Sequence, residues 1–202
     1  SIVNKVESPD LPFSLSMNPY QGCEHGCVYC YARNTHPYWG YSAGTEFEQN
    51  ILIKHDAPVL LRKFLQNKNY QCQTIMLSGN TDCYQPAEQD FKLTRQLLEI
   101  CLEYRQPVGI ITKNALVIRD LDLLIELNKL NLVQVVISLT SLDEKLRLLL
   151  EPRTATISKR LNAIFEISRH EIPVMVMMAP VIPGLTDNEI FDMIKACNDA
   201  GA

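Results

Sequence analysis

The stretch that decides how this chain folds is Asn18-Pro-Tyr-Gln-Gly-Cys-Glu-His-Gly-Cys-Val-Tyr-Cys-Tyr-Ala-Arg33. Cys23, Cys27 and Cys30 follow the pattern C-x3-C-x2-C, and Tyr29 directly precedes the last cysteine. A cubane iron–sulfur cluster is normally held by four cysteine thiolates. Three cysteines leave one iron open to another molecule, so the stretch predicts a [4Fe–4S] reaction centre.

Two other interpretations of these cysteines carry less weight. A structural zinc site needs four ligands, often as two CxxC or CxxC/HxxxH pairs; this stretch has one CxxC pair, with His25 or His36 as the remaining candidates. Disulfides are disfavoured because the chain has seven cysteines and residues 1–13 lack the apolar core of a signal peptide. We therefore expect a reducing, cytoplasmic compartment, in which clustered cysteines bind metals or catalyse.

Composition indicates an ordinary globular domain. The chain has 202 residues, of which 47% are hydrophobic and 21% charged, enough for a full core. No apolar run reaches the length of a membrane span, so we expect no membrane partner. The net charge of −4 gives no general support for nucleic-acid binding. One basic group, more typical of a solvated helix face, consists of Lys145, Arg147, Arg153, Lys159 and Arg160.

Strand-like and helix-like segments alternate along the chain. Near-continuous apolar runs predict parallel strands that are covered on both faces. These runs are Phe13–Met17, Thr74–Leu77, Val108–Ile111, Leu132–Leu139 and Pro173–Val181. Apolar residues at helical spacing predict helices around 60–65, 91–105, 121–128, 157–165 and 190–197.

Three short signals predict helix ends. Ser141 with Glu144, and Thr186 with Glu189, have the spacing of capping boxes, in which each side chain satisfies a free backbone donor. Gly201 suits the left-handed residue that ends the last helix.

Five strand–helix units predict an α/β fold with a parallel sheet that curls toward a barrel. A closed eight-fold barrel typically needs about 250 residues, and this chain ends where a sixth strand would begin. We therefore expect residues 1–202 to be one domain, a partial (β/α) barrel cut before its sixth unit. The alternative is an open flavodoxin-like sheet, which does not explain the long stretch 18–56.

Polar residues and glycine follow each predicted strand. In parallel α/β proteins the active site lies at the carboxyl ends of the strands. Besides the cysteine stretch, the segments at these ends are Ser78–Asp82, Thr112–Asn114, Ser138–Ser141 and Ala179–Gly184.

The cysteine stretch and its flanks resemble the radical S-adenosylmethionine (SAM) superfamily, and more narrowly the branch of spore photoproduct lyase and its relatives named DNA repair photolyases. The resemblance implies an enzyme whose open iron binds SAM. One electron from the cluster then cleaves SAM to methionine and a 5′-deoxyadenosyl radical, which abstracts hydrogen from a substrate. It also implies an electron donor such as flavodoxin or ferredoxin.

The resemblance implies SAM contacts at matching positions. Ser78–Asp82 resembles the segment that binds the SAM amino group, although an ordinary turn is the alternative. Lys113 would pair with the methionine carboxylate, and Ser138 would donate to that carboxylate or to the ribose, unless it only satisfies backbone. The aromatic against adenine corresponds to Tyr29. The full set is Tyr29, Tyr31, Ser78, Gly79, Asn80, Thr81, Asp82, Lys113 and Ser138.

The chain departs from the lyase at one position. The lyase has a hydrogen-donating cysteine on the strand before its SAM-binding serine, whereas Ile75-Met-Leu-Ser78 has none. No catalytic residue beyond the cluster is assigned. Three functions stay open: a lyase-like enzyme acting on nucleic acid, a radical SAM enzyme acting on an unrelated small molecule or protein, and a zinc-stabilised α/β binding module. Glu151-Pro-Arg153 is interpreted first as structural and second as a substrate or SAM contact.

Overall fold

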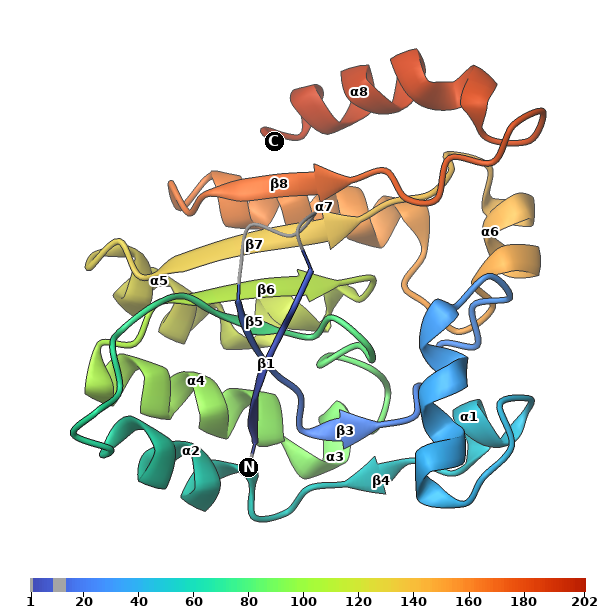
Figure 1. The fold of residues 1–202 in the computed structure, drawn as a ribbon. Helices are drawn as coiled ribbons and strands as arrows, with labels where there is room; N and C mark the ends of the chain where they lie inside the picture. Colours follow the sequence, from blue (N-terminus) through green and yellow to red (C-terminus); the bar gives the residue numbers. More distant parts are fainter. Residues whose placement is uncertain (1, 9–13) are drawn as a thin grey trace.

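The computed structural model describes residues 2–8 and 14–202 as an α/β fold built on a six-stranded sheet (Figure 1). The strands, in sheet order, are β1 (Val3–Lys5), β2 (Leu15–Met17), β5 (Ile75–Leu77), β6 (Val108–Thr112), β7 (Val133–Ser138) and β8 (Val174–Met177). Strands β2, β5, β6, β7 and β8 are parallel, and β1 pairs antiparallel with β2. The prediction of a parallel α/β fold is confirmed, and β1 is an addition to it.

The sheet winds in one direction. The parallel strands lie in the order in which they occur in the chain, and neither edge strand pairs with the other among the described residues. A flavodoxin-like sheet has the order 2-1-3-4-5 instead, so the alternative of a doubly wound sheet is wrong. The sheet has the winding of an open barrel.

Strand positions agree with the apolar runs. All three residues of β5 are buried, as expected for a strand covered on both faces. Phe13, the first residue of one predicted strand, lies outside the described residues. The prediction of a strand up to Val181 is wrong, because β8 ends at Met177 and Pro180 has no N–H to donate to a ladder.

Helices occupy the five predicted stretches and cover the sheet. They are α2 (Ala57–Leu65), α4 (Leu93–Tyr104), α5 (Leu121–Asn128), α7 (Ile157–Ser168) and α8 (Ile190–Asp199). Short helical segments add α1 (Glu46–Gln49), α3 (Glu88–Phe91), α6 (Glu144–Leu150), η1 (Tyr31–Trp39), η2 (Ala115–Asp120) and η3 (Asp187–Glu189). Residue Lys92, with φ 51°, separates α3 from α4, so the predicted helix beginning at Phe91 is in fact two.

The predicted capping box at Ser141 and Glu144 is wrong. The carboxylate of Asp143 caps α6 instead, accepting from the backbone N–H of Lys145 at 2.7 Å. The Ser141 hydroxyl donates to Glu189, 2.9 Å away and 48 residues later in the chain. A tertiary partner has therefore replaced the local one.

The second predicted capping box is also wrong, because the Thr186 side chain makes no cap hydrogen bond. Thr186 Oγ1 accepts from the backbone N–H of Ile182 at 2.8 Å, and the Glu189 carboxylate accepts from Leu142. The prediction at Gly201 is confirmed, since this residue follows α8 with φ 100°. Only glycine adopts this conformation without strain.

The stretch 18–56, which shows no periodicity in the sequence, is ordered. Strands β3 (Tyr20–Gln21) and β4 (Leu52–Ile53) pair antiparallel, and η1 and α1 lie between them. Phe47 of α1 is buried against Cys23 and Ala32, so this region has its own small core. Figure 1 shows the region at the end of the sheet toward which strands β6, β7 and β8 point.

Strand β8 is an edge of the described sheet. Val174 and Val176 pack against the core, whereas Met175 and Met177 are exposed. Continuation of the sheet by a sixth unit, and the assignment of residues 1–202 to one incomplete core domain, stay predictions.

Candidate cofactor site

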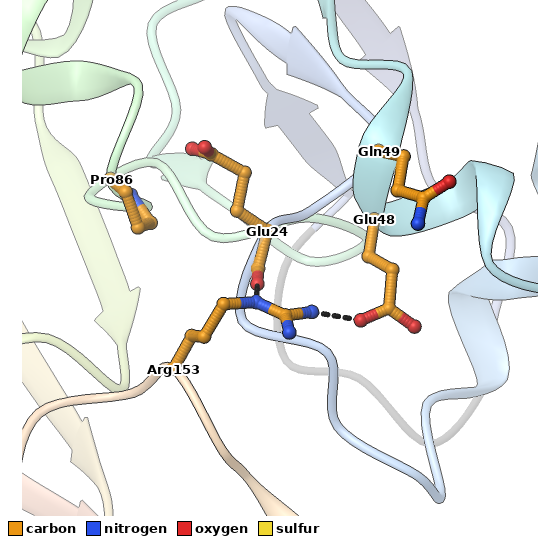
Figure 2. A pocket seen from close by; sticks show the side chains of 5 residues that line it. All are labelled: Glu24, Glu48, Gln49, Pro86 and Arg153. Atoms are coloured by element: carbon orange, nitrogen blue, oxygen red, sulfur yellow. Dashed lines mark hydrogen bonds and ion pairs between the residues drawn. The ribbon is translucent and has the colours of Figure 1, made fainter.

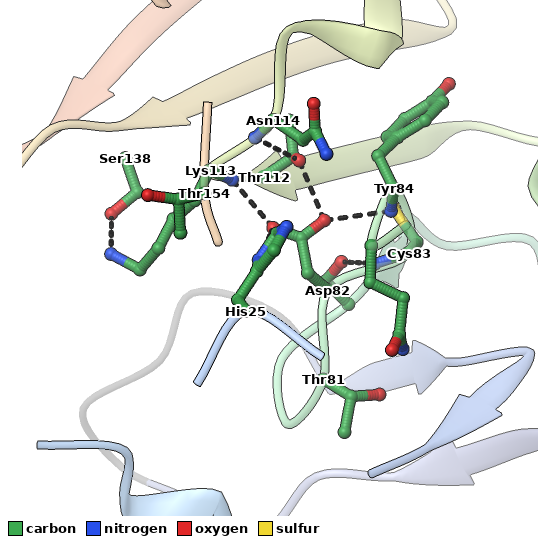
Figure 3. A network of polar contacts seen from close by, with 12 residues as sticks. His25, Thr81, Asp82, Cys83, Tyr84, Thr112, Lys113, Asn114, Ser138 and Thr154 are labelled. Carbon is green, nitrogen blue, oxygen red and sulfur yellow. Dashed lines mark hydrogen bonds and ion pairs between the residues drawn. The ribbon is translucent and has the colours of Figure 1, made fainter. Parts of the chain in front are cut away.

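Four loops meet at the carboxyl ends of the parallel strands. The cysteine stretch follows β2, residues 78–82 follow β5, Lys113 follows β6, and Ser138 ends β7. Neighbouring strands pair in parallel register, so these ends lie at one edge of the sheet. Of the predicted site residues, Figure 3 shows Asp82, Lys113 and Ser138 lying close together.

The cysteine loop is partly buried and contains three free thiols. Cys23 and Cys27 are buried, while Cys30 is half-buried and packs on the cluster formed by Cys23, Ala32 and Phe47. The backbone N–H of Cys23 donates to the carbonyl of Phe47 at 2.8 Å, which fixes the loop to α1.

The donor set of this loop fits a cluster with an open iron. Burial, first, and neighbouring negative charge raise the pKa of the Cys23 thiol, and burial raises that of Cys27 to about 12. Metal ligation needs thiolates, so loading the loop would release protons. Among the described residues, no three His, Cys, Asp or Glu side chains converge on a single ion. A cubane differs from such a site, because each cysteine binds a separate iron.

Lys113 lies at the centre of a buried charge network. Its ammonium donates to Ser138 Oγ at 2.6 Å and pairs with Glu151 Oε1 at 3.0 Å. The other oxygen of Glu151 pairs with Arg160 at 2.6 Å. The hydroxyl of Tyr29, from the cysteine loop, also donates to Glu151. The predicted residues Tyr29, Lys113 and Ser138 are therefore joined through a carboxylate.

The network carries an excess of positive charge. Burial alone would raise the pKa of Glu151, but Lys113 and Arg160 outweigh it and hold the pKa at about 2. Burial and the charge of Glu151 raise the pKa of Tyr29, so its hydroxyl stays protonated and donates. Two cations share one carboxylate, and the remaining charge suits an anionic group such as a carboxylate.

The Asp82 carboxylate accepts hydrogen bonds from groups of the protein itself. It accepts from the backbone N–H of Lys113 at 2.7 Å, the hydroxyl of Thr112 at 2.7 Å and the backbone N–H of Tyr84 at 2.8 Å. The Nδ1 atom of His25 lies 3.4 Å away, and burial lowers the pKa of this histidine. Asp82 ties three loops together, so its contact with SAM stays a prediction.

The rest of the 78–82 loop divides into buried and open residues. Ser78, with φ 82°, accepts from the backbone N–H of Cys83 at 3.0 Å, and the buried Thr81 hydroxyl donates to the carbonyl of Tyr20 at 2.8 Å. Asn80 is exposed and Gly79 half-buried. These two are the residues of the loop that are open to a ligand.

Tyr31 connects the cysteine loop to the 78–82 loop. Its hydroxyl donates to the carbonyl of Gly79, 48 residues away in the chain. The side chain is 70% exposed and lies beside Cys30 in sequence. Tyr31 is therefore placed where a ligand of both loops would contact it.

Sequence reasoning missed part of the site. Glu151, Thr140 and Arg160 are all buried in the network, and Thr140 Oγ1 donates to Glu151 at 2.9 Å. From the sequence, Glu151-Pro-Arg153 is interpreted first as structural and second as a substrate or SAM contact, with no partner assigned to Glu151. The predicted solvated basic face is wrong for Arg147 and Arg160, which are buried.

The fold and the site define a parallel α/β protein with a three-cysteine loop at its strand ends. The family model of the radical SAM superfamily matches residues 17–197, and the chain belongs to this superfamily.

Relatives share most of this chain. An uncharacterized protein of Mycobacterium tuberculosis is 36% identical over 189 residues, which cover 93% of this chain and 56% of the relative. An uncharacterized protein of Methanocaldococcus jannaschii is 30% identical over 188 residues, covering 93% of this chain and 67% of that protein. The chain thus spans little more than half the length of the mycobacterial relative.

Solved structures of spore photoproduct lyase share the fold. One mutant superposes with a TM-score of 0.68 at 17% identity, over 98% of this chain and 55% of that chain. Another, with bound AdoMet and dinucleoside spore photoproduct, gives 0.66 at 17% identity, over 97% and 54%. Among the described residues, no helix has the length and apolar character needed to cross a bilayer.

Proposed function

We propose that this chain is a radical SAM enzyme that holds a [4Fe–4S] cluster on Cys23, Cys27 and Cys30. When bound, the cluster supplies the electron that cleaves SAM to methionine and a 5′-deoxyadenosyl radical, which abstracts hydrogen from a substrate. One observation carries the proposal: Tyr29, between two of the cysteines, contacts Glu151, which holds Lys113. The cysteine loop therefore borders a cationic site.

The residues of the network suit the methionine end of SAM. Lys113 and Ser138 present an ammonium and a hydroxyl 2.6 Å apart, and both can donate to a carboxylate. The SAM ammonium needs acceptors, and Asn80 and the carbonyl of Gly79 lie on the open side of the neighbouring loop.

The aromatic residues suit the adenosine end. Lys113 lies over the ring of Tyr29, 5.5 Å from its centroid, so this ring is held beside the carboxylate-binding lysine. Tyr31 reaches from the cysteine loop to Gly79. An adenine placed between the two loops would stack on one of these rings.

The proposal needs an electron donor, for which a flavodoxin-type or ferredoxin-type protein is the natural class. It keeps two substrate classes: a nucleic acid, to which the dinucleoside spore photoproduct bound in the structural neighbour is related, and an unrelated small molecule or protein. Burial of Arg147 and Arg160 leaves fewer basic side chains for phosphate contact, which counts against nucleic acid.

Anaerobic reconstitution tests the proposal. We expect brown protein with about four irons per chain, which forms 5′-deoxyadenosine from SAM when a chemical reductant is added. A variant with all three cysteines changed to alanine is the control and should take up no cluster. Tight binding of one zinc that blocks iron uptake, or iron-loaded protein that forms no 5′-deoxyadenosine, would overturn the proposal; the first result would favour the zinc-stabilised binding module.

A further inference from the structure

Residues 150–153 lie along the cysteine loop. The backbone N–H of Val28 donates to the carbonyl of Leu150 at 2.9 Å, and that of Arg153 donates to the carbonyl of His25 at 3.2 Å. The Arg153 side chain donates to the carbonyl of Glu24 (Figure 2). Contacts to residues on both sides of Cys27 fix this segment against the loop.

Arg153 holds the segment from the outside. Its guanidinium pairs with Glu48 (Figure 2). It also occupies the space where a side chain at Gly26 would be. Gly26 has φ 68°, so a larger residue there would be strained as well as displaced. Glycine at position 26 therefore leaves the space in the cysteine loop that the Arg153 side chain occupies.

Glu151 faces the other way, into the network. One oxygen, Oε1, is shared by Lys113, Tyr29 and Thr140, and the other, Oε2, is taken by Arg160. The side chain is 2% exposed, so little water competes for these contacts. One carboxylate therefore fixes both an aromatic of the cysteine loop and the lysine at the end of β6.

We propose, building on the proposed function, that Glu151 is a positioning residue for both halves of the SAM site. Its charge keeps the Lys113 ammonium at Ser138 for the methionine carboxylate, and its acceptor oxygen keeps Tyr29 in place for the adenosine. These two tasks depend on different properties of the side chain.

The two tasks can be separated by substitution. Glutamine at this position retains an acceptor oxygen for Tyr29 but loses the charge. Lys113 and Arg160 then repel each other without a carboxylate between them, and the flexible lysine, 18% exposed, turns its ammonium toward water. Alanine removes both the charge and the acceptor.

The test uses calorimetric titration of cluster-loaded protein with L-methionine and, separately, with 5′-deoxyadenosine. Glu151→Gln should weaken methionine binding by about tenfold or more, comparable to the loss when a hydrogen-bond partner of a metal ligand is removed, and leave 5′-deoxyadenosine binding unchanged. Glu151→Ala should weaken both. Tyr29→Phe should weaken only 5′-deoxyadenosine. Glu103→Gln, the same substitution at an exposed pair with Arg62 outside the network, should change neither.

Two results would overturn this assignment: unchanged methionine binding in Glu151→Gln, or an equal loss of both probes, which indicates a general structural role. If Glu151→Gln does not fold, Glu151→Asp replaces it, because the shorter side chain keeps the charge beside Arg160 but withdraws it from Lys113. The same loss of methionine binding is expected, and the same two results overturn it. Failure of the parent protein to bind SAM would instead count against the proposed function.

Discussion

Two carboxylates at the cofactor site, Asp82 in the loop after β5 and Glu151 directly after α6, are held in opposite ways. Asp82 accepts from two backbone N–H groups and from the Thr112 hydroxyl, and Nδ1 of His25, a histidine whose pKa is lowered by burial, lies 3.4 Å away. Glu151 pairs with two cations, Lys113 and Arg160. Among the described side chains, no lysine or arginine pairs with Asp82.

The two carboxylates therefore act differently: Asp82 fixes the backbone of its loops, and Glu151 fixes the position of a charged side chain. Backbone donors fix the course of a loop, so Asp82 determines where the residues around it lie. Cations respond to the charge of their partner, so Glu151 determines where the Lys113 ammonium lies. Both carboxylates act on Lys113, one through its backbone and the other through its side chain.

The largest effect is expected from Arg160→Met. Arg160 is fully buried, and its removal leaves Glu151 with a single cation and frees the carbonyl of Ser138. Breaking a buried pair in this way costs about 3–5 kcal/mol. Urea unfolding measures the loss. Arg62→Met, which removes an exposed pair with Glu103, is the control and should have little effect. A loss in Arg160→Met no larger than in the control would contradict the comparison.

Acid should weaken the Glu151 region. The folded-state pKa of Glu151, about 2, lies below its ordinary value of 4.5, so the stabilisation is complete above pH 4.5 and is lost as the pH falls toward 2. The shift corresponds to about 3 kcal/mol at most. The measurement is the free energy of unfolding of the parent and of Glu151→Gln from about pH 6 to about pH 3. The parent should lose more; parallel curves would show that the carboxylate is not held in this way.

Asp82→Asn should have a smaller effect. An amide nitrogen in place of one oxygen faces donors, so one of them loses its acceptor at a cost of about 1–3 kcal/mol. Because the Lys113 backbone shifts as well, SAM binding should weaken a few-fold. Abolished SAM binding with an unchanged free energy of unfolding would show instead that Asp82 contacts SAM directly, as the sequence predicts.

Local patterns predicted the elements better than their ends. The apolar runs of β5, β6 and β7 reflect burial on both faces, which a short window of sequence records. The capping boxes failed because Ser141 and Glu189 bond to each other across 48 residues. A local motif competes with tertiary partners that lie outside any window.

The candidate site likewise has a part that local sequence predicts and a part that depends on tertiary contacts. Spacing, the aromatic before Cys30 and the residues after it predict Cys23, Cys27 and Cys30 as cluster ligands, because ligands that come from one loop are local in sequence; this assignment stays a prediction. The partners of Glu151 come from residues 29, 113, 140 and 160, so its role depends on how four loops meet. The ion pairs of this network could be assigned only from the folded structure, in which the strand ends lie side by side.

The smallest effect concerns the threonine hydroxyls beside each carboxylate. Thr140→Val removes a hydroxyl that donates to Glu151 and also lies 3.2 Å from both the Ala179 carbonyl and the Tyr29 hydroxyl. Glu151 keeps both cations, so we expect a loss of about 0.5–1.5 kcal/mol and little change in SAM affinity. Thr112→Val removes a donor from Asp82 and also the acceptor for the backbone N–H of Asn114, 2.9 Å away. Its expected cost is higher, about 1–3 kcal/mol. Because the substitution is the same and both sites are buried, the apolar contributions nearly cancel in a comparison by urea unfolding. Equal costs would mean that the acceptor that Thr112 provides for the backbone N–H of Asn114 contributes no measurable stability, and the expected order of the two variants would be wrong.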